Sequence, residues 1–164
     1  MELKELYQDI ILEHGKKPRN FGKCQGYSHE AKGHNPLCGD QVQVYVKLNH
    51  KKTVEDLTFE GSGCAISIAS SSIMTELIKG KSFEAVKSII NDFLNMIKNA
   101  TEMKSSDLTD DQKTKIMSLS GVKQYPMRVK CATLSWHTLV SALEGKKEEV
   151  NTELTDSWAI LKTR

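Results

Sequence analysis

Three cysteines and one aspartate are the residues of this 164-residue chain best suited to chemistry. In the stretch NPLCGD, Cys38 lies two positions before Asp40, at the start of a segment with the alternation of a strand. Cys64 follows the stretch GSG and begins a helical pattern, while Cys131 lies near the start of the last helical pattern. Each of these thiols could be a redox group, a metal ligand or a small buried side chain.

A metal site shared by these side chains is one interpretation. Zinc binds thiolates and also accepts carboxylate oxygen, so three thiolates and Asp40 would complete a tetrahedron. The start of a helix favours a thiolate, and Arg128 and Lys130 should lower the pKa of Cys131 further. The long spacings between the cysteines match no compact zinc-finger pattern, so unrelated buried thiols are an equally good interpretation of spacing alone.

The remaining candidates have weaker patterns. Cys24, in GKCQGY, is expected to be a buried or exposed thiol without a ligand role, and no histidine is a first-choice ligand. The serines at 70–72 are expected to pack closely within a helix. The sequence contains neither a C-x-x-C motif nor a phosphate-binding loop of the G-x-x-x-x-G-K-S/T type.

Composition argues against several classes of function. A net charge of +2 and an isoelectric point near 8.3, without a dense cluster of Lys and Arg, argue against a nucleic-acid partner. No apolar run approaches the length of a membrane span, and the acidic N-terminal stretch MELKELYQDIILE does not resemble a signal peptide. We therefore expect a cytoplasmic protein without a membrane partner, in a compartment where structural disulfides are rare.

The elements that must position the candidate residues can be predicted from hydrophobic periodicity. Strands are predicted at 24–32, 41–48 and 53–60, the first from a weak pattern. Helices are predicted at 2–14, 64–80, 83–97, 109–121 and 128–143. A helix, then strands, then a run of helices is typical of an α+β domain, with a small antiparallel sheet and helices packed on one face.

The length of the chain favours a single domain, which we place at residues 1–145. Residues 146–164, which follow Gly145, are predicted to form a charged C-terminal extension. Trp158, Ile160 and Leu161 in this extension could dock it onto the domain.

Four motifs, in the same order, resemble the IscU-like family of iron–sulfur cluster assembly proteins, and within it the SufU branch. They are LYQDIILEHGKKPRNFG, NPLCGD, FEGSGCAISIASSSIMTE and VKCATLSWHTL, and the resemblance extends over about residues 5–145. It implies an α+β fold with a three-stranded antiparallel sheet and helices on one side. The IscU branch has a histidine where this chain has Lys130, and a chaperone-binding LPPVK motif where this chain reads QYPMRVKC, so the SufU branch is favoured.

The resemblance also implies a function and a set of site residues. Zinc would be held by Cys38, Asp40, Cys64 and Cys131, and Cys38 would accept sulfur from a SufS-type cysteine desulfurase, supported by Arg128. Sulfurtransferase activity would then require the desulfurase, and downstream iron–sulfur assembly proteins would be further partners. An alternative is a scaffold on which the three cysteines hold iron or a transient [2Fe–2S] cluster. A third is a zinc module whose metal only stabilises the fold.

Overall fold

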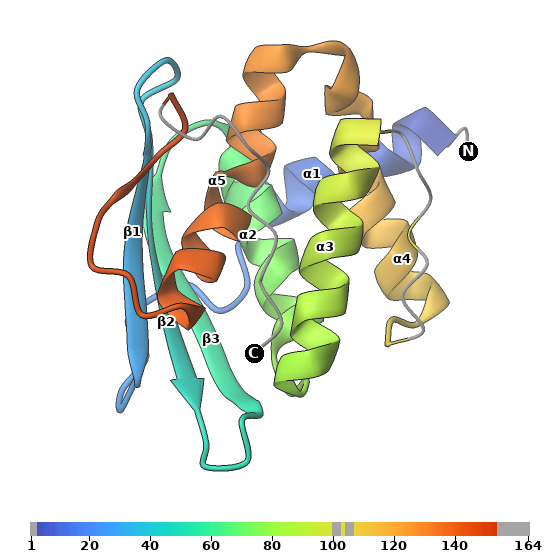
Figure 1. Cartoon of the computed structure of the whole chain (residues 1–164). Coiled ribbons are helices and arrows are strands. Elements are labelled where there is room, and N and C mark those ends of the chain that lie inside the picture. The colour runs from blue at the N-terminus through green and yellow to red at the C-terminus, as the bar shows by residue number, and fades with distance from the viewer. Residues whose placement is uncertain (1–2, 100–102, 104–106, 154–164) are drawn as a thin grey trace.

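The computed structural model describes residues 3–99, 103 and 107–153, and its helices all lie on one side of a single sheet (Figure 1). The sheet has the strand order β3-β2-β1-β4. Its strands are β1 (His29–Asn35), β2 (Asp40–Leu48), β3 (Val54–Ser62) and β4 (Val150–Asn151). The helices are α1 (Leu3–Lys16), α2 (Ala65–Ile78), α3 (Phe83–Asn99), α4 (Asp110–Met117), the 3-10 helix η1 (Ser118–Gln124) and α5 (Pro126–Leu143).

The predicted α+β architecture is confirmed. β1, β2 and β3 form the antiparallel sheet that the resemblance implied, and the two-residue β4 adds a short parallel strand beside β1. β4 lies in the segment predicted to be a C-terminal extension, so part of that segment belongs to the sheet. The division of the chain at residue 145 stays a prediction, and Trp158, Ile160 and Leu161 lie outside the described residues.

Two predicted elements differ from the structure by more than two residues at a boundary. The weak first strand is at His29–Asn35 rather than 24–32, because its polar sequence HEAKGHN takes its register from pairing with β2, not from its own alternation. The short fourth helix ends at Met117, and the chain continues to Gln124 as a 3-10 helix. The predicted capping box of α4 is confirmed, because the side chains of Thr109 and Gln112 each accept a hydrogen bond from the other residue's backbone N–H.

The serine run in α2 allows α5 to approach closely. Ser70, Ser71 and Ser72 are fully buried, as expected for small residues that pack closely within a helix. The Ser70 hydroxyl accepts a hydrogen bond of 3.0 Å from the indole Nε1 of Trp136, which stacks on Phe93 with ring centroids 4.0 Å apart. α2, α3 and α5 are thereby joined around one buried aromatic pair. Within the described ranges, no helix is long and apolar enough to cross a bilayer.

Burial of His137 should make stability depend on pH. Burial lowers the pKa of this imidazole from 6.5 to about 4, so between these values the unfolded chain binds a proton that the folded chain does not. The stability that depends on a neutral His137 is fully present above pH 6.5 and is lost as the pH falls toward 4. When the pH is lowered from 7 to 5, the free energy of unfolding should fall by about 2 kcal/mol less in His137→Gln than in wild type.

Urea denaturation of wild type and variant at the two pH values measures this difference. His50→Gln, at an exposed turn position, is the matched control and should behave as wild type does. Equal losses of stability in wild type and His137→Gln would show that His137 does not contribute to the acid sensitivity of the fold.

Candidate metal centre

Two thiols and a carboxylate from distant parts of the chain meet at one end of the sheet. The ligand atoms of Cys38, Asp40 and Cys131 all lie within 4.8 Å of one another. The Sγ atoms of Cys38 and Cys131 are 3.3 Å apart, although the two residues are separated by 93 positions in the sequence. The structure therefore brings together three of the four residues that the sequence assigned to a metal site.

The hairpin between β1 and β2 places Cys38 beside Asp40. Asn35, the last residue of β1, pairs with Asp40, the first residue of β2, and the loop 36–39 between them carries Cys38. Gly39 closes this loop with a φ of 72°, which favours glycine, and its N–H donates a hydrogen bond of 2.8 Å to the Asn35 carbonyl. Cys38 is consequently at a loop tip, while Asp40 is anchored in the sheet.

Asp40 is a fully buried carboxylate with both oxygens hydrogen-bonded. Its exposed fraction is 0%, its Oδ1 accepts from the Cys64 backbone N–H at 2.9 Å, and its Oδ2 accepts from Asn35 Nδ2 at 3.2 Å. Gly63 makes the first of these bonds possible. Its φ is 150°, and a Cβ there would lie 2.2 Å from Asp40 Oδ1. Any larger residue at position 63 would collide with the carboxylate.

Cys64 is adjacent to the group of three but not part of it. It is the N-cap of α2, and its Sγ accepts a hydrogen bond of 3.4 Å from the Ser67 N–H. Its backbone contact with Asp40 keeps the residue beside the centre. The assignment of Cys64 as a fourth ligand therefore stays a prediction.

The pKa of the Cys131 thiol is shifted in the direction opposite to the one expected from the sequence. Burial raises the pKa of its thiol well above the ordinary value, and hydrogen bonds to Asp40 and Cys38 act in the same direction. The expected lowering of the pKa is wrong, because Cys131 lies in the second turn of α5, away from the helix N-terminus, and is fully buried. Lys130 is paired with Glu153, with its Nζ 2.6 Å from the carboxylate.

Arg128 is a cationic side chain that interacts with the thiols of the centre. The pKa of its guanidinium is raised, first of all by the thiol of Cys131 and then by those of Cys64 and Cys38, which favour the charged form. The supporting role of Arg128 stays a prediction.

The donor set fits zinc or an iron–sulfur cluster better than a hard cation. Two thiols that converge, a third beside them and one carboxylate are sulfur and oxygen donors of the kind that zinc sites use, and thiolates also hold iron–sulfur clusters. Calcium and magnesium prefer oxygen ligands throughout. The thiols of this site must lose their protons on metal binding, which the charge of the ion promotes.

The other cysteine and the histidines do not join the centre. The Sγ of Cys24 lies 3.5 Å from the Asp56 carboxylate. The residue is buried, which is one of the two possibilities, buried or exposed, expected from the sequence. His14 contacts the Ser72 hydroxyl at 2.7 Å in the core. None of the histidines within the described residues belongs to the group of converging ligands.

Asn35 is a site residue that the sequence reasoning missed. Its amide Nδ2 lies 3.2 Å from Asp40 Oδ2 and 3.6 Å from Cys131 Sγ. The available signal was its place at the start of NPLCGD, but an asparagine before a proline is usually explained as a turn former.

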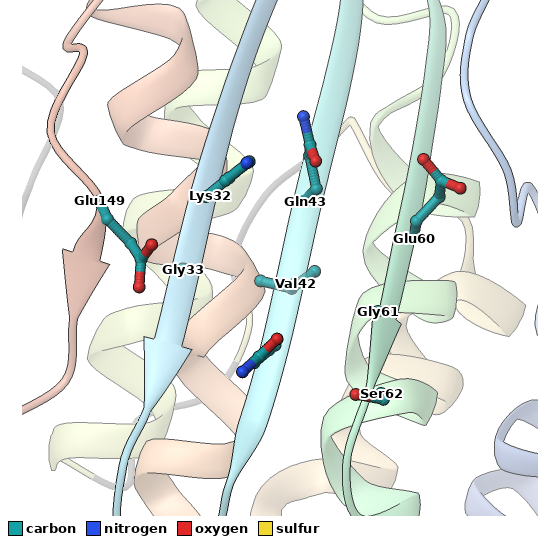
Figure 2. Close-up of a pocket in the computed structure, with 9 residues that line it drawn as sticks. Lys32, Gly33, Val42, Gln43, Glu60, Gly61, Ser62 and Glu149 are labelled. Carbon is teal, nitrogen blue, oxygen red and sulfur yellow. The ribbon is translucent and has the colours of Figure 1, made fainter.

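A hollow on the outer face of the sheet is separate from this centre. Figure 2 shows its side chains on β1, β2 and β3, with Glu149 beside β1 and the helices behind the sheet. Its volume is about 450 Å³, and its lining mixes Lys32 with Glu60, Glu149 and amide side chains. No converging ligand lines it, so it does not extend the metal centre.

Comparison with known proteins agrees with this geometry. The family model for the NifU-like N terminal domain matches residues 6–132. The chain belongs to this family. The resemblance stated from the four motifs is therefore confirmed, and the metal centre lies within the NifU-like domain, with Cys131 near the end of the matched segment.

Relatives of this NifU-like chain include proteins of both branches. The zinc-dependent sulfurtransferase SufU of Bacillus subtilis (strain 168) is 43% identical over 137 residues, which cover 84% of this chain and 88% of that protein. The iron–sulfur cluster assembly scaffold protein IscU of Streptococcus pyogenes serotype M1 is 35% identical over 87% of this chain and 86% of that protein.

Solved structures have the same fold. The crystal structure of a proposed iron–sulfur cluster assembly scaffold protein for the SUF system, from Fervidobacterium islandicum AW-1, has a TM-score of 0.74 and 34% identity. It is matched over 97% of its length, by 85% of this chain. An N-terminal NifU-like protein from Brucella abortus, at 22% identity and a TM-score of 0.75, shares the fold.

Gly63→Ala should weaken zinc binding without unfolding the chain. The added Cβ would displace the Asp40 carboxylate from its position beside Cys64. We expect the affinity for zinc, measured by competition with a chromophoric chelator, to fall at least about tenfold. Gly80→Ala is the matched control, because Gly80 also has a positive φ of 86° but has open space around its Cβ position. Similar zinc affinities for the two variants would contradict a specific need for glycine beside Asp40.

Proposed function

We propose that this chain is a zinc-dependent sulfurtransferase of iron–sulfur cluster assembly, which accepts sulfur on Cys38 from a cysteine desulfurase. The observation that carries the proposal is the unequal burial of the converging ligands. Asp40 and Cys131 are fully buried, whereas Cys38 is partly exposed at the tip of a loop. A site of this kind can present one thiol to a partner while the other ligands stay anchored. The 43% identity to a protein named zinc-dependent sulfurtransferase SufU supports it.

Zinc would be held by Cys38, Asp40, Cys64 and Cys131. When bound, it keeps the coordinating thiols deprotonated at neutral pH. Cys64 would contribute its Sγ by turning it from the Ser67 N–H toward the centre, while its own N–H continues to hold Asp40. The carboxylate is thus fixed by a neighbouring ligand residue before any metal arrives.

The transfer step is an exchange between sulfur atoms. The Cys38 thiolate attacks the outer sulfur of a persulfide on the desulfurase, and a new S–S bond forms on Cys38. The S–S bond of the donor breaks, and the desulfurase cysteine leaves as a thiolate with the electron pair. The product is a persulfide on Cys38, without net oxidation. The exposed position of Cys38 provides the access that an in-line attack requires.

Arg128 would support this exchange electrostatically. The thiols of Cys131, Cys64 and Cys38 favour its charged form, so its guanidinium would offset part of the negative charge that several thiolates and Asp40 carry. It is also exposed, so it can contact an acidic group of the partner. This role rests on position and charge.

An apolar rim beside Cys38 suits a protein partner. The rim consists of Leu37, Tyr125 and Met127, which are 55%, 61% and 54% exposed. Leu37 precedes Cys38, and the Met127 carbonyl accepts a hydrogen bond from Cys131 at 3.5 Å, so the rim borders the thiols. Exposed aromatic and Met side chains are enriched at interfaces. We propose that a SufS-type desulfurase docks here, in the cytoplasm, where unpaired thiols are the norm.

A cluster scaffold is the second candidate. The IscU relatives are named scaffold proteins, and the same three cysteines with Asp40 could hold a [2Fe–2S] cluster. The metal found in the purified protein and the response of the desulfurase separate the two functions.

Metal analysis and desulfurase turnover test the proposed function together. Protein purified without added metal should contain one zinc ion per chain and should accelerate the desulfurase. Cys38→Ala should reduce turnover to the rate of the desulfurase alone, because the acceptor thiol is missing. Cys24→Ala, which removes a buried thiol outside the centre, is the matched control and should retain the acceleration. Iron with labile sulfide and no acceleration would instead identify a scaffold.

The rim should determine partner affinity rather than metal binding. Leu37→Asp or Met127→Asp should raise the concentration of this protein needed for half-maximal acceleration by at least about tenfold, with zinc content unchanged. Leu12→Asp, at an α1 residue that is 51% exposed outside the rim, provides the control. If the rim variants and the control gave the same half-maximal concentration, the partner would have to dock elsewhere.

A further inference from the structure

The Asn35 side chain uses both ends of its amide at the metal centre. It is fully buried between β2 and α5, and its Nδ2 donates to Asp40 Oδ2 at 3.2 Å and to Cys131 Sγ at 3.6 Å. Its Oδ1 accepts a hydrogen bond of 3.1 Å from the Thr152 hydroxyl. The amide therefore connects two converging ligands to a residue that follows β4, 117 positions away in the sequence.

Only one orientation of this amide suits the ligands. A carboxylate and a thiolate are both hydrogen-bond acceptors, so they pair with the NH2 end of the amide. A flipped amide would place Oδ1 against the Asp40 carboxylate, where two acceptors repel. In the favoured orientation the Thr152 hydroxyl donates to Oδ1, so both ends of the amide are hydrogen-bonded. The NH2 group also stabilises two anionic ligands without adding a positive charge that would compete with a metal ion.

The C-terminal clamp, which we define as residues 150–153, holds Thr152 in place. Its first two residues are β4, which pairs in parallel with Gly33 and His34 of β1. The Thr152 N–H donates to the His34 carbonyl at 3.1 Å, and Glu153 forms a 2.6 Å ion pair with Lys130 of α5. The clamp is thus attached on both sides of Asn35, to the strand that carries Asn35 and to the helix that carries Cys131.

We propose that Asn35 is a positioning residue for the metal centre, and that the C-terminal clamp holds its amide in place through the Thr152 hydroxyl. The inference rests on the proposed metal site and goes beyond its ligands. Among the described residues, Asn35 hydrogen-bonds Asp40 and Cys131 but not Cys38. The clamp therefore stabilises the positions of the two buried ligands, Asp40 and Cys131. Cys38 is left as the ligand that can depart to receive sulfur.

Zinc affinity of threonine variants tests the proposal most directly. Thr152→Val keeps the shape of the side chain but removes the hydroxyl that holds the Asn35 amide, so zinc affinity should fall about tenfold in chelator competition. Thr152→Ser retains a hydroxyl and should bind zinc as wild type does. Thr75→Val, at a buried threonine of α2 that contacts Asn20, controls for loss of a buried hydroxyl elsewhere.

A spectroscopic readout and a double variant separate positioning from general stability. In Co²⁺-loaded protein, Thr152→Val should shift the visible absorption bands, which report ligand geometry, and Thr75→Val should not. Asn35→Ala should lower zinc affinity at least as much as Thr152→Val. The combined variant should be no weaker than Asn35→Ala alone, because both changes act through one amide.

The outcomes distinguish this inference from the proposed function. Wild-type affinity and an unchanged cobalt spectrum in Thr152→Val would overturn the clamp while leaving the sulfurtransferase proposal intact. Additive losses in the double variant would also overturn it, because Thr152 would then act independently of Asn35. A wild-type chain that binds no zinc would overturn the proposed function and this inference with it.

Discussion

The need to stabilise one buried carboxylate organises this end of the molecule. A carboxylate removed from water costs several kcal/mol unless hydrogen bonds or a cation replace its hydration. Asp40 receives one bond from the N–H of Cys64 and one from the amide of Asn35. The hydrogen bond from Cys64 requires a glycine at position 63 and places the start of α2 beside β2. The hydrogen bond from Asn35 requires the end of β1 in register with the start of β2. The positions of three elements therefore follow from the environment of a single side chain.

The fold separates anchored ligands from an accessible one. Asp40 begins a central strand and Cys131 is buried in a helix that packs on the sheet, so neither can move without disturbing the core. Cys38 is in the loop 36–39, which is attached at both ends to paired strands but is not itself part of the sheet. This division gives a physical basis for a site that keeps its metal while one thiol exchanges sulfur.

Much of the scaffold was predictable because its patterns are local. The alternation of β2, the amphipathic α3 and the capping box of α4 each depend on residues within one element. The predicted bounds of β1 were wrong because HEAKGHN has weak strand propensity, and its position is determined by pairing with β2. The link between Asn35 and Thr152 was not predictable, because 117 residues separate two side chains that carry no shared motif. The elevated pKa of Cys131 depends in the same way on burial that only the assembled structure creates.

The crowding of acidic groups explains why a metal and an arginine belong to the same site. Burial is the main reason that the pKa of Cys131 is raised, and the nearby Asp40 and Cys64 act in the same direction, so a thiolate at Cys131 is disfavoured without a cation. Arg128 is exposed, so solvent screens much of its charge, and it cannot neutralise the buried groups alone. A bound divalent ion would offset this effect and permit several thiolates at neutral pH. Departure of Cys38 would then remove one negative ligand, while Asp40 and Cys131, held by Asn35, keep the remaining charge beside the ion.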